Sequence, residues 1–235
     1  MAVTLIFGGT SEGRLAAEKE KDALVCVATE YGASLLPPGT NCHIGRLDRN
    51  EMLEFIRTLR PGRVIDATHP YAVKATDNIR ACCTELDIPY ERISRPSVSG
   101  SWSTLVRHAK SAEHAAHLLT ETGGNILLTT GSQTLSTYAA TIPAERLWVR
   151  VLPTRAALEF CELAGIHPSH IIAMQGPFSP ELNGALYDHF NIHVMVTKDS
   201  GSAGGLEEKV LPALAREMDV IVIDRPDANQ GDPQQ

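Results

Sequence analysis

The 235-residue sequence lacks the features that mark exported, membrane-spanning or nucleic-acid-binding proteins. No stretch approaches the roughly 18 apolar residues that a transmembrane helix needs, and the apolar start ends at Gly8, too early for a signal peptide. Basic side chains number 21 against 28 acidic ones, giving a formal charge of −7, and they form no basic run. We therefore expect a cytoplasmic protein that binds neither membranes nor nucleic acid.

The sequence also lacks the usual signatures of disulfide-stabilised and metal-binding proteins. Its five cysteines form no Cys-x-x-Cys pair, which argues against a disulfide framework or a zinc knuckle. Three histidine pairs have spacings that could share a metal, but each lacks a third ligand nearby: His114 and His117, His167 and His170, His189 and His193. We expect no protein-bound metal.

Short runs of Val, Ile and Leu alternate with segments of helical periodicity, a pattern typical of parallel strands joined by helices. Eleven strands are expected, near residues 3–7, 24–28, 42–44, 63–66, 90–94, 104–108, 126–129, 147–152, 171–174, 194–197 and 220–223. The fold class is α/β, with two Rossmann-like domains of mainly parallel sheets flanked by helices. A Pro/Gly/Ser cluster at 95–101 predicts domains at 1–96 and 97–235, with a flexible tail over 227–235.

A glycine-rich segment follows the first expected strand and precedes a helix expected to begin near Arg14. Backbone amides at such a turn can bind a phosphate group, whereas the lysine of a nucleoside-triphosphate loop is missing. A tight strand-to-helix turn is the structural alternative. We favour a nicotinamide dinucleotide and assign to it Gly8, Gly9, Thr10, Ser11 and Gly13.

Glu30 lies 22 positions after Gly8, close to where an acidic residue binds a ribose 2′-hydroxyl in dinucleotide-binding folds. This placement favours NADH over NADPH. A solvated loop glutamate is an equally good interpretation, so the cofactor is NADPH or NADH on this evidence.

The segment Asp66–Ala72 places a hydroxyl, an imidazole and a phenol directly after another expected strand. Such groups at a strand end are typical of a site. We assign Thr68 to the cofactor, and His69 and Tyr71 are candidates for a proton relay. Tyr71 and Lys74 are three positions apart, so the Tyr-x-x-x-Lys spacing of short-chain dehydrogenases is absent.

Seven short motifs occur in an order that resembles the precorrin-6A reductase family and its cobalt-precorrin-6A counterparts, and they span nearly the whole chain. They are Phe-Gly-Gly-Thr-Ser-Glu-Gly at 7–13, Ala-Thr-Glu-Tyr-Gly at 28–32, Asp-Ala-Thr-His-Pro-Tyr-Ala at 66–72, Arg-Pro at 95–96, Thr-Thr-Gly-Ser at 129–132, Gln-Gly-Pro-Phe at 175–178 and Thr-Lys-Asp-Ser-Gly at 197–201.

The resemblance implies hydride transfer from NADPH or NADH to the tetrapyrrole macrocycle of precorrin-6A or cobalt-precorrin-6A in cobalamin biosynthesis. It also implies a ligand cleft between the two domains that holds the cofactor and the tetrapyrrole. Because such a macrocycle carries many carboxylates, cations and polar groups near strand ends are expected to bind it. The candidate substrate-binding residues are Arg95, Ser132, Gln175, Lys198, Asp199 and Ser200. Arg150 and Arg225 are equally consistent with surface ion pairs. The sequence indicates no oligomeric state.

Two other functions compete with this interpretation. One is another Rossmann-type NAD(P)-dependent oxidoreductase, against which the missing Tyr-x-x-x-Lys spacing argues. The other is a nucleotide-sensing module without catalysis, which would not need polar strand-end loops in a second domain.

Overall fold

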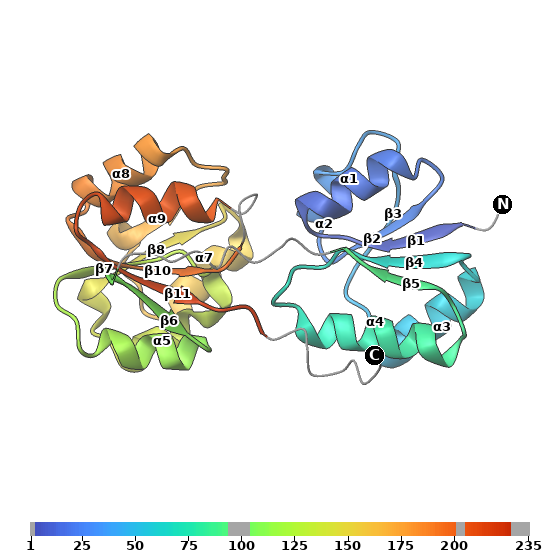
Figure 1. Cartoon of the computed structure of the whole chain (residues 1–235), viewed down its shortest axis with the longest axis horizontal. Helices are drawn as coiled ribbons and strands as arrows, with labels where there is room; N and C mark the ends of the chain where they lie inside the picture. The colour runs from blue at the N-terminus through green and yellow to red at the C-terminus, as the bar shows by residue number, and fades with distance from the viewer. Residues whose placement is uncertain (1–2, 94–103, 201–204, 227–235) are drawn as a thin grey trace. The chain divides into compact units, whose positions relative to one another are not determined.

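Eleven parallel strands in two separate sheets organise the part of the chain that the computed structural model describes, namely residues 3–93, 104–200 and 205–226. The chain divides into two units, Met1–Arg95 and Pro96–Gln235. Helices cover both faces of each sheet (Figure 1). This arrangement confirms the predicted α/β class with mainly parallel sheets.

The first unit contains a sheet with the strand order β3-β2-β1-β4-β5. Its strands are β1 (Thr4–Phe7), β2 (Leu24–Val27), β3 (Asn41–Ile44), β4 (Arg63–Asp66) and β5 (Tyr90–Arg92). One face is covered by α1 (Ser11–Lys19) and α2 (Glu30–Ser34), and the other by α3 (Arg49–Leu59) and α4 (Val73–Glu85). Leu5 faces the second pair of helices and Ile6 the first, and both are fully buried, as expected for a strand enclosed on both faces.

The second unit contains a sheet with the strand order β6-β11-β10-β7-β8-β9. Its strands are β6 (Val106–Ala109), β7 (Asn125–Leu128), β8 (Leu147–Val151), β9 (Ile171–Ala173), β10 (Ile192–Lys198) and β11 (Asp219–Ile223). The α-helices are α5 (Ala112–Leu119), α6 (Leu135–Ala139), α7 (Arg155–Leu163), α8 (Pro180–His189) and α9 (Leu206–Leu214). Short 3₁₀ helices occupy Ser132–Thr134, Ala144–Arg146 and Pro168–His170.

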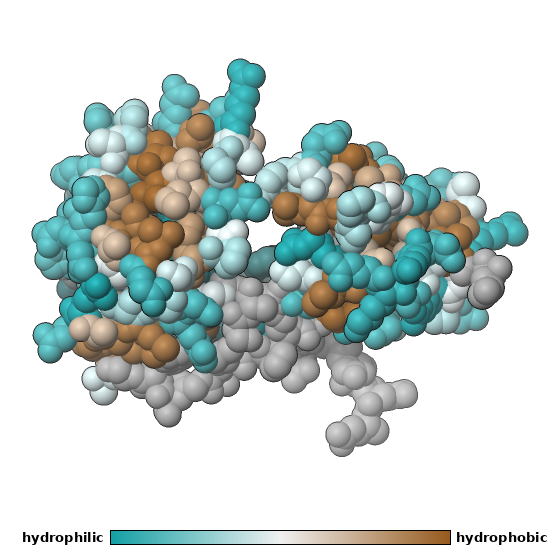
Figure 2. All heavy atoms as spheres, turned by 90° about the horizontal axis from the view of Figure 1, so that it is seen from above, coloured by the Kyte–Doolittle hydropathy of each residue, from teal (hydrophilic) through white to brown (hydrophobic). Residues whose placement is uncertain are grey.

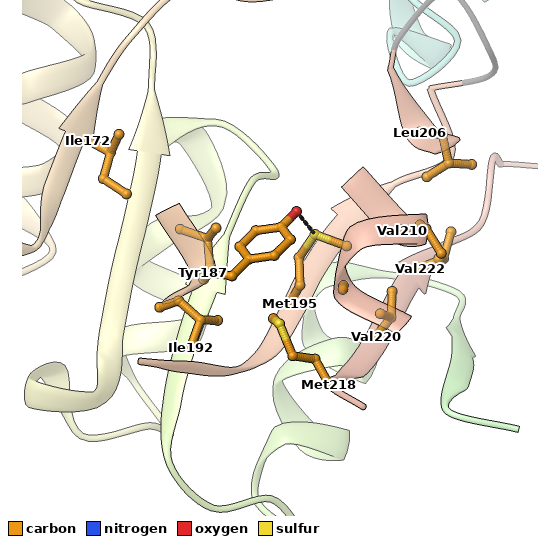
Figure 3. Close-up of a cluster of buried hydrophobic side chains, with 11 residues drawn as sticks. Ile172, Tyr187, Ile192, Met195, Leu206, Val210, Met218, Val220 and Val222 are labelled. Carbon is orange, nitrogen blue, oxygen red and sulfur yellow. Dashed lines mark hydrogen bonds between the residues drawn. The ribbon is translucent and has the colours of Figure 1, made fainter. Parts of the chain in front are cut away.

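A buried cluster joins α8 and α9 to the second sheet (Figure 3). Tyr187 of α8 lies inside this cluster, and its hydroxyl approaches the sulfur of Met195 at 3.2 Å. The same hydroxyl donates to the Lys209 carbonyl on α9 at 3.0 Å. Burial raises the pKa of Tyr187, so the phenol stays protonated and fixes α8 against α9.

The face of the molecule that Figure 2 shows carries apolar patches among hydrophilic side chains. Leu15 on α1 and Leu211 on α9 are among the most exposed apolar side chains, at 54% and 53%. Leu211 follows the fully buried Val210, so α9 presents one face to the core and the other to solvent.

The predicted strands agree with the observed strands to within two residues at each end. The helix expected near Arg14 begins earlier, at Ser11, and that prediction was wrong because the Thr10 side chain caps the helix. The predicted domain boundary after residue 96 falls among residues 94–103, which lie outside the described part, as does the predicted flexible tail over 227–235.

Candidate functional site

Each sheet has one topological switch point, a pair of neighbouring strands from which the chain builds the sheet outward in opposite directions. The pair is β1 and β4 in the first unit and β7 and β10 in the second. Ligands of open parallel sheets bind outside the carboxyl ends of the strands at such switch points. Most of the predicted site residues follow one of these four strands. Each unit therefore offers one candidate site at its own switch point.

The β1 loop has the close approaches and the backbone shape that only glycine allows. A Cβ at Gly8 would lie 3.2 Å from a Val25 methyl group, and one at Gly13 would lie 3.0 Å from the Gly8 Cα. Gly9 has a φ of 118°, and no heavy atom beyond its chain neighbours lies within 4 Å of the position a Cβ would take. The backbone at Gly9 is thus open to a ligand.

The start of α1 is tied to the β4 loop through Thr10. Its hydroxyl accepts from the Gly13 amide at 3.2 Å and donates to the Ala67 carbonyl at 2.8 Å. Ser11 and Gly13 consequently lie in the first turn of the helix, whereas the sequence had suggested that they lie in the loop before it. The amides of this turn still lie at the helix N-terminus, where anions bind.

Arg14 is a residue that the sequence analysis missed as a candidate ligand. Its guanidinium Nη2 donates to the Ser11 hydroxyl at 2.9 Å, which holds a positive charge at the first turn of α1. A basic residue directly after Gly13 was the available signal.

Asp66 is fully buried at the end of β4 and organises the loop that follows. One carboxylate oxygen accepts from the Thr68 amide at 3.0 Å and the Thr68 hydroxyl at 2.8 Å, while the other accepts from the Tyr90 hydroxyl at 3.0 Å. Arg92 completes an ion pair with Asp66 and donates to the Thr68 carbonyl at 3.2 Å. Burial, followed by the Asp66 charge, raises the pKa of Tyr90 to about 12. The network fixes the backbone at Thr68.

The structure therefore places Thr68 within an internal network as well as at the switch point. Its hydroxyl contacts Asp66, the Arg92 guanidinium at 2.8 Å and the Thr76 hydroxyl at 3.2 Å. Arg92 and Tyr90 were missed because each lies 24 positions from its partner, on a strand whose sequence carries no motif.

His69 and Tyr71 lie side by side in the β4 loop, with ring centroids 5.5 Å apart. The Tyr71 amide donates to the His69 Nδ1 at 3.3 Å. When His69 is neutral, its proton must therefore reside on Nε2. The imidazole is exposed and can donate a proton through Nε2.

Glu30 is the first residue of α2 and follows β2, the neighbour of β1. The hydroxyl of Thr29 caps this helix by accepting from the Gly32 amide at 3.0 Å. Glu30 is exposed at the same carboxyl edge as the β1 loop. The structure thus places it beside the other predicted cofactor residues of this unit.

The second switch point gathers Ser132, after β7, and Lys198, Asp199 and Ser200, at the end of β10. Burial lowers the pKa of Lys198. Asp199 is 6% exposed, and the Arg225 Nε donates to its carbonyl at 3.0 Å and lies 3.5 Å from its carboxylate. The edge therefore combines hydroxyl groups with cationic side chains.

Two predicted substrate residues are not placed at this switch point. Gln175 is exposed after β9, an edge strand separated from β7 by β8. Arg95 lies outside the described residues. Within the described ranges no group of three or more His, Cys, Asp or Glu side chains could hold a metal ion. No helix in these ranges is long and apolar enough to cross a membrane.

The sequence profile of one known family, described as precorrin-6x reductase CbiJ/CobK, matches residues 4–235. The cobalt-precorrin-6A reductase of Priestia megaterium is 35% identical over 235 residues, covering 97% of this chain and 92% of that protein. The cobalt-precorrin-6A reductase of Methanothermobacter thermautotrophicus is 34% identical over 232 residues, covering 96% of this chain and 77% of that protein.

A solved structure described as CobK precorrin-6A reductase superposes with a TM-score of 0.80 at 22% identity. The match covers 99% of this chain and 91% of that one. At this identity the likeness concerns the fold, and it supports the α/β architecture independently of the sequence comparisons.

Proposed function

Because this chain belongs to the precorrin-6x reductase CbiJ/CobK family, we propose that it reduces a precorrin-6A macrocycle in cobalamin biosynthesis, using hydride from a nicotinamide dinucleotide. The structural observation that carries the proposal is the switch point of the first unit. There the open β1 loop, the N-terminus of α1 and the loop ordered by Asp66 meet at one sheet edge. Dinucleotides bind this arrangement in Rossmann-like sheets.

The residues of the first unit fit a pyrophosphate group. Gly9 leaves room for it, the first-turn amides of α1 can donate to it, and the Arg14 guanidinium adds a positive charge. Gly8 and Gly13 contribute by letting α1 approach β1 closely, and Thr68 by fixing the β4 loop. When bound, the nicotinamide supplies the hydride, and the protein binds and orients both reactants.

We assign the adenosine ribose to Glu30, whose exposed carboxylate can accept a hydrogen bond from the 2′-hydroxyl. A 2′-phosphate would bring a second negative charge to the same place. The proposal therefore favours NADH over NADPH.

We assign the tetrapyrrole to the second unit, with its carboxylates near Lys198 and near hydroxyl groups of Ser132 and Ser200. The Asp199 carboxylate would repel an anionic ligand, so we do not assign it a direct contact with the tetrapyrrole. Its proposed contribution is to hold Arg225 in place. Gln175 and Arg95 complete the proposed set. The two relatives described above are both named for cobalt-precorrin-6A, which favours a substrate that already contains cobalt.

The experiment that tests the proposal is anaerobic incubation of the purified protein with cobalt-precorrin-6A or precorrin-6A and with NADH or NADPH. We expect oxidation of NADH together with a change in the tetrapyrrole spectrum, fastest with the cobalt-containing substrate. Cofactor binding without oxidation in any combination would contradict the proposal and favour a nucleotide-sensing module. Faster turnover with NADPH would contradict only the role of Glu30.

His69 is proposed to donate the proton that accompanies hydride transfer, without being indispensable. Replacing His69 by alanine should slow turnover about tenfold, because water can supply the proton less efficiently. The pH–rate profile should flatten near neutrality, where an imidazole titrates.

The comparison variant is Tyr71→Phe, which removes the hydroxyl of the other candidate for the proton relay but keeps its ring and the backbone amide that binds His69. It should leave the shape of the pH profile unchanged. A His69→Ala protein with the wild-type profile would remove His69 from the reaction, and complete loss of reduction with both ligands bound would make it obligatory.

A further inference from the structure

A row of polar side chains crosses the second sheet just beyond its hydrophobic core, on the face that α8 and α9 cover. The strand register aligns Thr197 of β10, Thr129 after β7 and Arg150 of β8. Two positions earlier, the same face is filled by the core residues Met195 and Leu127. The polar row therefore marks where the core ends, at the carboxyl edge of the sheet.

Arg150 is buried on β8, at 6% exposure. Its Nη1 donates to the fully buried Asn183 at 2.6 Å, and its guanidinium lies 4.2 Å from the centre of the Phe178 ring. The Asn183 amide nitrogen donates to the Ser179 carbonyl at the start of α8 and to the Glu208 carbonyl in α9, while its oxygen accepts from Arg150. Within the described residues Arg150 forms no ion pair with a carboxylate.

Lys209 brings a second cation to the same place from α9. Its Nζ lies 3.5 Å from the Thr197 hydroxyl, and within the described ranges it too lacks an ion pair. Burial and the Arg150 charge lower the pKa of Lys209 from 10.5 to about 8, and the Glu208 charge only partly opposes them. At neutral pH both cations are charged. The carboxylate that lies near them is that of Glu208, which forms no ion pair with either cation within the described residues.

Holding these charges inside the ligand-free protein is unfavourable. Arg150 is buried and Lys209 is half-buried, and without paired carboxylates the two cations lose hydration that hydrogen bonds to Asn183 and Thr197 do not fully replace. Because the folded pKa of Lys209 lies below its unfolded value, the charged lysine destabilises the fold at neutral pH, and this effect fades as pH rises from about 8 toward 10.5. Because the charged Arg150 and Lys209 side chains lower the stability of the fold, we attribute them to the binding of a ligand.

We propose that Arg150 and Lys209 form an anion-binding subsite that receives one carboxylate of the tetrapyrrole substrate. Naming the tetrapyrrole rests on the proposed function. The Arg150 guanidinium carbon lies over the Phe178 ring, and a carboxylate would bind the N–H groups at the edge of the guanidinium. A phosphate of the cofactor would offer similar chemistry, and the test separates the two sources.

The test uses Lys209→Met in the full chain, with Lys110→Met as the control at an exposed lysine of the same unit. Binding is measured by titration with uroporphyrin I, a stable octacarboxylate tetrapyrrole, and separately with NADH and NADPH. Lys209→Met should weaken uroporphyrin binding about tenfold, leave dinucleotide binding within about twofold, and raise the melting temperature without ligand by a few degrees. Lys110→Met should change none of these.

A second variant, Arg150→Lys, keeps the charge but loses the planar donor pair, and it should also weaken uroporphyrin binding. Unchanged uroporphyrin affinity in both variants, or no uroporphyrin binding by the wild type, would overturn the subsite. A lower melting temperature for Lys209→Met would indicate an internal structural role, and a selective loss of dinucleotide affinity would assign the anion to the cofactor. If the wild type reduces cobalt-precorrin-6A while these results fail, only the subsite is refuted.

Discussion

Asp66→Asn should lower the free energy of unfolding of the first unit by about 3 kcal/mol, because breaking a buried ion pair leaves an uncompensated charge. Asp66 is fully buried and is the only carboxylate paired with Arg92 within the described residues. The amide side chain keeps the shape of the carboxylate but cannot neutralise Arg92. It also turns an acceptor into a donor that faces either Thr68 or the Tyr90 hydroxyl.

The two units give separate signals in a urea titration. The first unit contains no tryptophan, and Trp148 packs against the core of the second unit, so tryptophan fluorescence does not follow the first unit, while circular dichroism follows both. Asp66→Asn should move the dichroism transition to lower urea and leave the fluorescence transition in place. Equal shifts in both signals would show that the damage is not confined to the first unit.

The control for the Asp66 prediction is Glu20→Gln, which removes an ion pair of the same unit that lies at the surface. The Arg63 Nη2 and Glu20 carboxylate are 2.6 Å apart, but the two side chains are 43% and 33% exposed. Exposed pairs contribute about 0–1 kcal/mol, so this variant should be nearly neutral. A comparable loss in both variants would contradict the argument from burial.

The strands were predictable because strands buried on both faces read as short apolar runs. For β4, the sequence predicts both ends of the strand, Arg63 and Asp66, since a glycine precedes the run and polar residues come soon after it. Where the apolar pattern is weaker, the observed end of a strand differs from the predicted one. The strand β10 begins at Ile192, two residues before the predicted Val194. The exposed His193 interrupts the apolar run, so the pattern does not reveal that Ile192 and His193 belong to the strand.

The parts of the site that were missed depend on contacts between distant segments. The Asp66 network needs side chains from β4 and β5, and sequence spacing does not reveal which residue of β5 faces Asp66. Lys209 did leave a signal, because it falls at a core-facing position between Leu206 and Val210 in a helical period. A lysine there indicates a cation that faces the core, but its neighbour Arg150 comes from a strand far away in the chain.

Gly9→Val should weaken binding of the nicotinamide dinucleotide about a hundredfold, equivalent to roughly 2.7 kcal/mol, by blocking the approach of the pyrophosphate to the β1 loop. The site next to Gly9 is open, so the methyl groups would occupy the space assigned to the ligand. The φ of 118° also disfavours any side chain, so the fold itself should lose on the order of 1–3 kcal/mol.

Gly39→Val separates the loss of the site from the backbone strain. Gly39 has a φ of 82° and equally open surroundings, but it precedes β3 and so lies at the amino edge of the sheet, away from the switch point. Both variants should lose similar stability in urea, while calorimetry with NADH should detect weakened binding only for Gly9→Val. Equal affinities in the two variants would remove the β1 loop from the cofactor site, because the strain they share would then account for every effect of the Gly9 substitution.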